Sequence, residues 1–110
     1  MSAYRVDRVR WPKMGIFDQM GNLYSEVGRS IKAKQAGDEA GFEAALARAL
    51  DLFDATTEAL VAEKSVRVRE VLRAKDQYLQ LFYGGEESFS DAPKLENYFM
   101  QFAVAARLSR

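Results

Sequence analysis

The chain contains neither cysteine nor histidine. Without cysteine there can be no disulfide, no thiolate nucleophile and no thiolate metal site. Without histidine the chain lacks the commonest general base near neutral pH and the commonest transition-metal ligand. Any catalysis would therefore depend on carboxylates, lysine, tyrosine or serine. We expect no cofactor and assign no catalytic or metal-binding residue.

Long apolar runs are also missing. No stretch approaches the roughly 18 continuous apolar residues of a membrane span. Charges appear early in the chain, at Arg5, Asp7 and Arg8, in place of the apolar run of a signal peptide. We therefore expect a cytoplasmic protein without membrane contact. The 16 basic and 16 acidic residues give a formal net charge of zero, which lowers the expectation of nucleic-acid binding, because such binding draws its affinity from an excess of cations.

What the chain does have is apolar residues, 48% of its 110 positions, at helical spacing. They recur at steps of three and four in four stretches, which predicts four amphipathic helices. The predicted helices span residues 13–36, 39–63, 66–83 and, after a cap at Ser90 or Asp91, a stretch to about 108. Their core positions are Ile16, Met20, Leu23, Val27, Ile31, Phe42, Leu46, Ala49, Leu50, Phe53, Leu60, Val68, Val71, Leu72, Tyr78, Leu79, Phe82, Leu95, Tyr98, Phe99, Phe102 and Ala106.

Helix boundaries follow from capping residues. Gly37 can take the left-handed conformation that ends a helix, and Asp38 offers an N-cap for the next. Ser65 is predicted to cap the third helix. Short connections favour antiparallel neighbours. The prediction is an all-α, antiparallel up-down-up-down four-helix bundle over 12–110, preceded by an extended N-terminal arm over 1–11.

Helix one carries a strip of small residues. Gly21, Ser25 and Gly28 fall at steps of four and three, and glycine there costs about 1 kcal/mol relative to alanine. A strip without side chains lets another backbone come close. The strip can serve packing within the chain, contact with a second subunit, or a ligand.

The polar face of the same helix consists of Asp18, Asn22, Ser25, Glu26 and Arg29. A solvated face explains it simply. Short Asn and Ser are poor helix formers, however, so their presence beside the glycines also indicates a contact surface. We predict a partner interface that includes Asp18, Asn22 and Arg29.

Helix four has a second apolar stripe. Met100, Val104 and Leu108 follow each other at steps of four, on a side turned away from the core. A helix that is apolar on most sides is normally covered on most sides. Either the arm with Trp11 or a second copy of the chain could cover this stripe.

Helix two carries an acidic strip of Asp51, Asp54 and Glu58. Carboxylates on one helix face can ligate Mg²⁺, and helical pyrophosphohydrolases use acidic helix motifs of this general type. Their second acidic motif has no counterpart here, because helix three offers only Glu70 and Asp76. A solvated face is the simpler interpretation, and a magnesium-dependent hydrolase stays an alternative.

Helix three begins with a basic run in which Arg67, Arg69 and Arg73 could contact a nucleic acid. Attraction to the acidic helix two explains the run without a partner. Lys75 falls within the apolar stripe, where its ammonium group should reach the rim or pair with a carboxylate.

Four segments carry a resemblance. Met14–Asn22, Ser25–Arg29, Arg48–Thr56 and Tyr98–Arg107 resemble segments of small bacterial all-helical proteins that have no assigned function. The resemblance implies a prokaryotic helical bundle and carries no catalytic residue. The residues lead us to expect a non-enzymatic protein-interaction module that acts as a homodimer or with another protein. Nucleic-acid binding and Mg²⁺-dependent hydrolysis are the alternatives.

Overall fold

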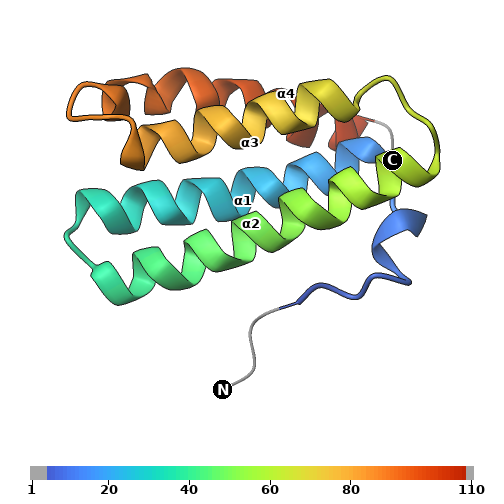
Figure 1. Cartoon of the computed structure of the whole chain (residues 1–110), viewed down its shortest axis with the longest axis horizontal. Helices are drawn as coiled ribbons and strands as arrows, with labels where there is room; N and C mark the ends of the chain where they lie inside the picture. Colours follow the sequence, from blue (N-terminus) through green and yellow to red (C-terminus); the bar gives the residue numbers. More distant parts are fainter. Residues whose placement is uncertain (1–4, 109–110) are drawn as a thin grey trace.

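The computed structural model describes residues 5–108, and every regular element in that range is helical. The predicted all-α class and the four helices are therefore confirmed. The elements in chain order are the short 3₁₀ turn η1 (Trp11–Lys13), α1 (Ile16–Gln35), α2 (Glu39–Ala62), α3 (Val68–Tyr83), the turn η2 (Ser88–Asp91) and α4 (Ala92–Leu108) (Figure 1).

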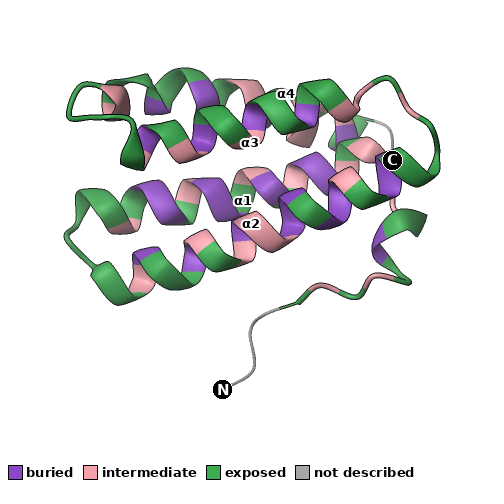
Figure 2. Cartoon of the chain, viewed as in Figure 1, coloured by how far each residue is buried: buried purple, intermediate pink, exposed green. Residues whose placement is uncertain are grey.

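Helix α1 is the centre of the packing. It contacts α2 along one side and α4 along another, while α3 rests on α2 and on the turn η2. In Figure 1 α1 and α2 lie side by side, with α3 and α4 across from them. Figure 2 shows buried residues on the sides of the helices that face one another. Met20, Leu23 and Val27 are fully buried there, as their spacing predicts.

The connection between α1 and α2 has the capping residues that the sequence predicts. Gly37 takes a left-handed φ of 72°. The Asp38 side chain accepts a hydrogen bond of 2.9 Å from the backbone N–H of Gly41, which satisfies one free donor of the first turn of α2.

The end of α2 uses the same geometry without a glycine. Lys64 has a φ of 57°, and the Ser65 N–H donates back to the Leu60 carbonyl over 2.9 Å. Because the chain turns here, α3 begins at Val68, two residues later than predicted. The Ser65 hydroxyl accepts from the Arg67 N–H at 3.2 Å, so it supports the turn that precedes the helix.

Replacing Lys64 by glycine should raise the free energy of unfolding by about 1 kcal/mol, because a left-handed backbone is costly for any residue with a Cβ atom. Urea denaturation measures it. The reciprocal change, Gly37→Ala, should lower stability by a similar amount, since only the backbone conformation opposes a Cβ atom there. Two shifts of the same sign would contradict this account.

The predicted core is wrong at Leu72, which is 46% exposed. Helix α3 instead turns Val71, Ala74 and Tyr78 inward. It packs on α2 and on the turn η2 and only sparsely on α4, and Leu72 lies on a side that these contacts leave partly open to solvent.

Candidate interaction face

The glycine strip of α1 faces α4. A Cβ atom on Gly21 would lie 3.4 Å from Cα of Ala103, and one on Gly28 would lie 3.9 Å from Oε2 of Glu96. The strip therefore faces another helix of the same chain, one of the alternatives that the sequence left open, and a Cβ atom at either glycine would make an ordinary van der Waals contact. Ser25 is exposed beside them.

The second apolar stripe of α4 is open to solvent. Met100 is 40% exposed, Val104 46% and Leu108 82%. The sequence left two possible covers for this stripe, the arm with Trp11 and a second copy of the chain. The prediction that Trp11 covers it is wrong. The described part of the arm runs along α2, and Trp11 is buried there with its indole N–H donating to Thr56 Oγ1 at 3.0 Å.

The two predicted patches form one continuous surface. Ala103 packs on Gly21, and on α4 it stands one helical turn from Met100 and next to Val104. A shallow hollow of about 210 Å³ marks the junction. It is lined by Asp18, Gly21, Asn22, Ala103, Ala106 and Arg107. We call the exposed surface of α1 and α4 around this hollow, with Ser25, Met100 and Val104, the α1–α4 face.

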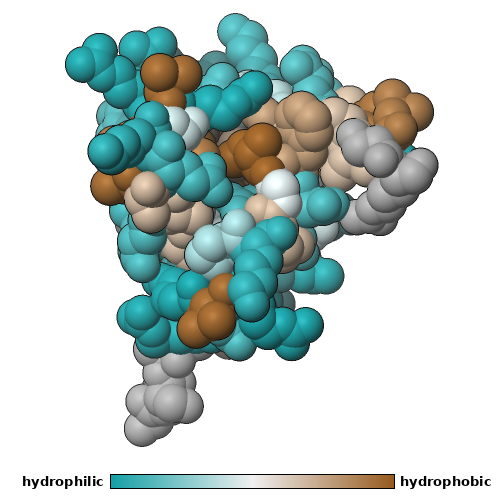
Figure 3. Space-filling model, turned by 90° about the vertical axis from the view of Figure 1, so that its right-hand side faces the viewer, coloured by the Kyte–Doolittle hydropathy of each residue, from teal (hydrophilic) through white to brown (hydrophobic). Residues whose placement is uncertain are grey.

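Apolar surface continues at the end of the bundle where α4 stops. Phe17, Val66 and Leu108 are exposed, Val66 to 94%. Figure 3 looks at this end of the molecule and shows apolar atoms from the middle of the view to its upper right. The Arg67 guanidinium lies 6.0 Å from the centre of the Phe102 ring, so part of the aromatic surface here is already covered by a cation.

Glu26 does not belong to the solvated polar face on which the sequence places it. It is 8% exposed, and its carboxylate pairs with Arg29 and, at 2.8 Å, with Nε of Arg48 on α2. Arg29 itself is exposed at the rim of the α1–α4 face. Glu26 lies at the edge of the buried stripe that faces α2. Helical spacing alone does not distinguish a residue at this edge from a solvent-exposed residue.

The acidic strip of α2 is engaged within the chain. Asp51 accepts from Arg8 Nη2 at 2.8 Å, and Glu58 accepts from Arg8 Nε at 3.3 Å. Burial by itself would raise the pKa of Asp51, but the hydrogen bonds from Arg8 and from the Val6 N–H outweigh it and lower that pKa. The hydrogen bond to Asp51 raises the pKa of Arg8. The strip therefore anchors the arm.

The remaining carboxylate of the strip, Asp54, pairs with Lys75 at 2.8 Å. Lys75 thus reaches the rim and pairs with a carboxylate, the two outcomes that its position predicts. Within residues 5–108, no group of three or more acidic side chains is arranged to hold a metal ion. All three carboxylates of the strip are therefore paired with cations of the same chain.

The basic run of α3 is only partly available. Arg67 pairs with Glu70 at 3.0 Å, whereas Arg69 and Arg73 are exposed without an ion-pair partner in the described part of the chain. Two free arginines on one helix form a small cationic surface. Tyr78, which follows them on the same helix, is fully buried and so offers them no aromatic surface.

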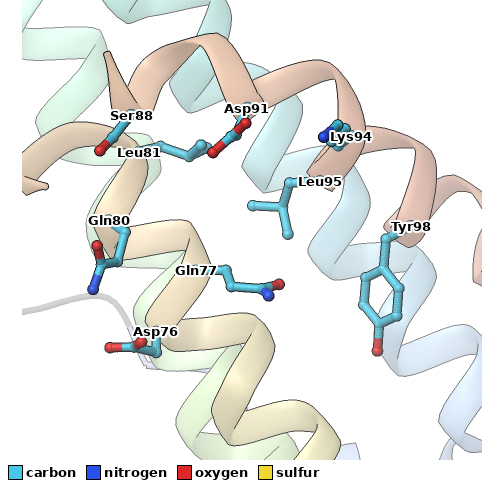
Figure 4. A pocket seen from close by; sticks show the side chains of 9 residues that line it. All are labelled: Asp76, Gln77, Gln80, Leu81, Ser88, Asp91, Lys94, Leu95 and Tyr98. Carbon is cyan, nitrogen blue, oxygen red and sulfur yellow. The ribbon is translucent and has the colours of Figure 1, made fainter. Parts of the chain in front are cut away.

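Sequence reasoning missed a cleft between α3 and α4. It has a volume of about 400 Å³ and is lined by Asp76, Gln77, Gln80, Leu81, Ser88, Asp91, Lys94, Leu95 and Tyr98 (Figure 4). The polar residues of α3 and α4 were the only signal, and they are equally typical of a solvated surface.

No family model, no curated protein and no solved structure matches this chain. The resemblance of the four segments to small bacterial helical proteins therefore stays a prediction. Among the described residues, no helix combines the length and the apolar character that crossing a membrane requires.

Proposed function

We propose that this chain is a non-enzymatic interaction module of the cytoplasm that assembles as a homodimer through the α1–α4 face. The observation that carries the proposal is the exposure of Met100 and Val104 on a regular helix, directly beside the hollow at Gly21. Exposed aliphatic side chains that adjoin a surface of small residues can be covered closely by a second helix pair. We take the bundle as antiparallel up-down-up-down, which its short connections favour.

Charge and size favour a second copy as the occupant. A formal net charge of zero means that two copies do not repel each other at long range. The face carries both signs of charge, with Asp18 and Arg107 at the hollow and Arg29 at the rim, so a two-fold interface can place opposite charges across from each other. An interface of ordinary size covers about 800 Å² per partner. The chain exposes 7200 Å², so one side of the bundle can supply that area.

The double substitution Met100→Glu with Val104→Glu should abolish the dimer. Four buried negative charges would then face one another across the two-fold axis, and we expect the dissociation constant to rise at least a hundredfold. Sedimentation velocity over a concentration series measures this shift.

Leu72→Glu is the matched control. Leu72 and Val104 are both 46% exposed and both lie on helices, but Leu72 is on α3, outside the α1–α4 face. The control should keep the dissociation constant of the wild type. Equal dissociation constants for wild type and the double variant would reject this face. A dimer that dissociates only in Leu72→Glu would place the interface on α3.

A further inference from the structure

The end of the bundle where α2 and α4 stop gathers strongly exposed aliphatic side chains. In Figure 1 this end lies on the right, where α1 and α3 begin. Among residues 5–108, every valine, leucine, isoleucine or methionine that is more than half exposed belongs to it, with exposed fractions from 58% to 94%: Val9, Val61, Val66 and Leu108. Single exposed apolar residues are ordinary on any surface, but their concentration at one end is typical of an interaction site.

Cations accompany the exposed aliphatic side chains. Three segments at this end, residues 7–13, 61–69 and 104–108, carry seven arginines and lysines against two carboxylates, Asp7 and Glu63. Glu58 and Glu70 lie next to these segments and are already paired with arginines. Five of the cations are exposed and have no ion-pair partner within residues 5–108: Arg10, Lys13, Lys64, Arg69 and Arg107. This end is therefore basic as well as apolar.

The other end of the bundle has the opposite charge. The segments around its two connections, residues 32–43 and 86–94, carry six carboxylates and three lysines. The formal net charge of zero therefore hides a separation of charge along the bundle. In the field of an anionic surface, the basic end turns toward that surface and the acidic end turns away from it.

A lipid bilayer matches this surface better than a protein partner does. The core of a protein interface is a closely packed apolar area. In Figure 3, which looks directly at this end, the most hydrophobic side chains stand at separate points with hydrophilic ones between them. A bilayer can receive each aliphatic side chain separately, while its anionic headgroups meet the cations in between. The expectation of no membrane contact rested on the lack of a long apolar run, and binding at a membrane surface needs no such run.

We propose that this end of the bundle binds the surface of an anionic lipid membrane. The exposed valines and Leu108 enter the layer between the headgroups and the acyl chains, and Lys64 and Arg69 contact the lipid headgroups. The proposal does not rest on the homodimer, because Val66 and these two cations lie on the connection between α2 and α3 and on the first turn of α3, outside the α1–α4 face.

Co-sedimentation of the full chain with lipid vesicles tests the proposal. We expect binding to vesicles made of equal parts of phosphatidylcholine and phosphatidylserine, and at least tenfold weaker binding to phosphatidylcholine alone. Val9→Ser with Val66→Ser should weaken binding to the mixed vesicles tenfold or more, because two aliphatic side chains no longer leave water for the bilayer. Leu72→Ser with Tyr83→Ser removes exposed apolar surface from the rest of α3 and should leave the binding unchanged.

A second pair of variants tests the charges. Lys64→Gln with Arg69→Gln should also weaken binding to the mixed vesicles tenfold or more, since each cation near an anionic membrane adds to the attraction. Lys32→Gln with Lys94→Gln removes two lysines from the acidic end and should bind as the wild type does. Absence of wild-type binding to the mixed vesicles would overturn the proposal. So would undiminished binding by the valine variant together with loss of binding by the Lys64, Arg69 variant, which would indicate a surface for a polyanion such as a nucleic acid.

Discussion

Trp11→Ala should lower the free energy of unfolding by about 3–5 kcal/mol, the cost typical of removing a buried indole. Trp11 is 5% exposed, and its N–H donates to Thr56 of α2. Its carbonyl accepts from the Gln19 amide at 3.0 Å, so the same residue joins the arm to α1. A loss of this size is a large fraction of the roughly 5–15 kcal/mol that stabilises an ordinary domain. Urea denaturation followed by circular dichroism measures it.

Thr56→Val separates packing from hydrogen bonding in this cluster. The substitution keeps the volume and removes only the acceptor of the indole N–H, so we expect a loss of about 1–3 kcal/mol. A cost below 1 kcal/mol for Trp11→Ala would mean that the arm is not docked on α2 in solution.

Phe53→Ala should have an effect of the same order, about 3–5 kcal/mol. Phe53 is fully buried, and its ring centre lies 5.6 Å from that of Tyr78 on α3 and 5.8 Å from that of Phe99 on α4. The side chain thus connects three helices, and its removal leaves a cavity that none of them can close alone. Thermal and urea unfolding of the variant give the value.

Phe17→Ala is the matched control for Phe53→Ala. The same atoms are removed from a side chain that is 38% exposed and touches one ring, Phe102, at 6.2 Å between ring centres. We expect a loss of about 1 kcal/mol. Equal losses at the two positions would contradict a core centred on Phe53.

The helices were predictable because burial against a neighbour imposes a period of 3.6 residues on the apolar positions. Met20, Leu23 and Val27 follow that period and are fully buried. The helix cap at Asp38 was equally predictable, because its side chain accepts a hydrogen bond from the backbone N–H of Gly41, only three residues away.

Contacts between distant segments were not predictable in the same way. Trp11 meets Thr56 across 45 positions, and Arg48 meets Glu26 across 22. Helical spacing gives the side of a helix on which a residue lies, but it does not give the neighbour on that side. For this reason Glu26 was placed on a solvated face, and the arm was considered as a cover for α4.

In the candidate sites, too, local spacing predicts the single strips but not the contacts between helices. The α1–α4 face was predicted as two separate strips, and the contact between Gly21 and Ala103 is what joins them. The cleft at Tyr98 depends on how sparsely α3 packs against α4, a property of the assembled helices that no spacing within either helix encodes.

Sedimentation equilibrium of the wild-type chain is the most direct test of the proposed self-association. We predict a mass twice that of the 12.4 kDa chain at concentrations on the order of tens of micromolar, with dissociation on dilution. A mass of one chain throughout that concentration range would contradict the proposal that the α1–α4 face binds a second copy.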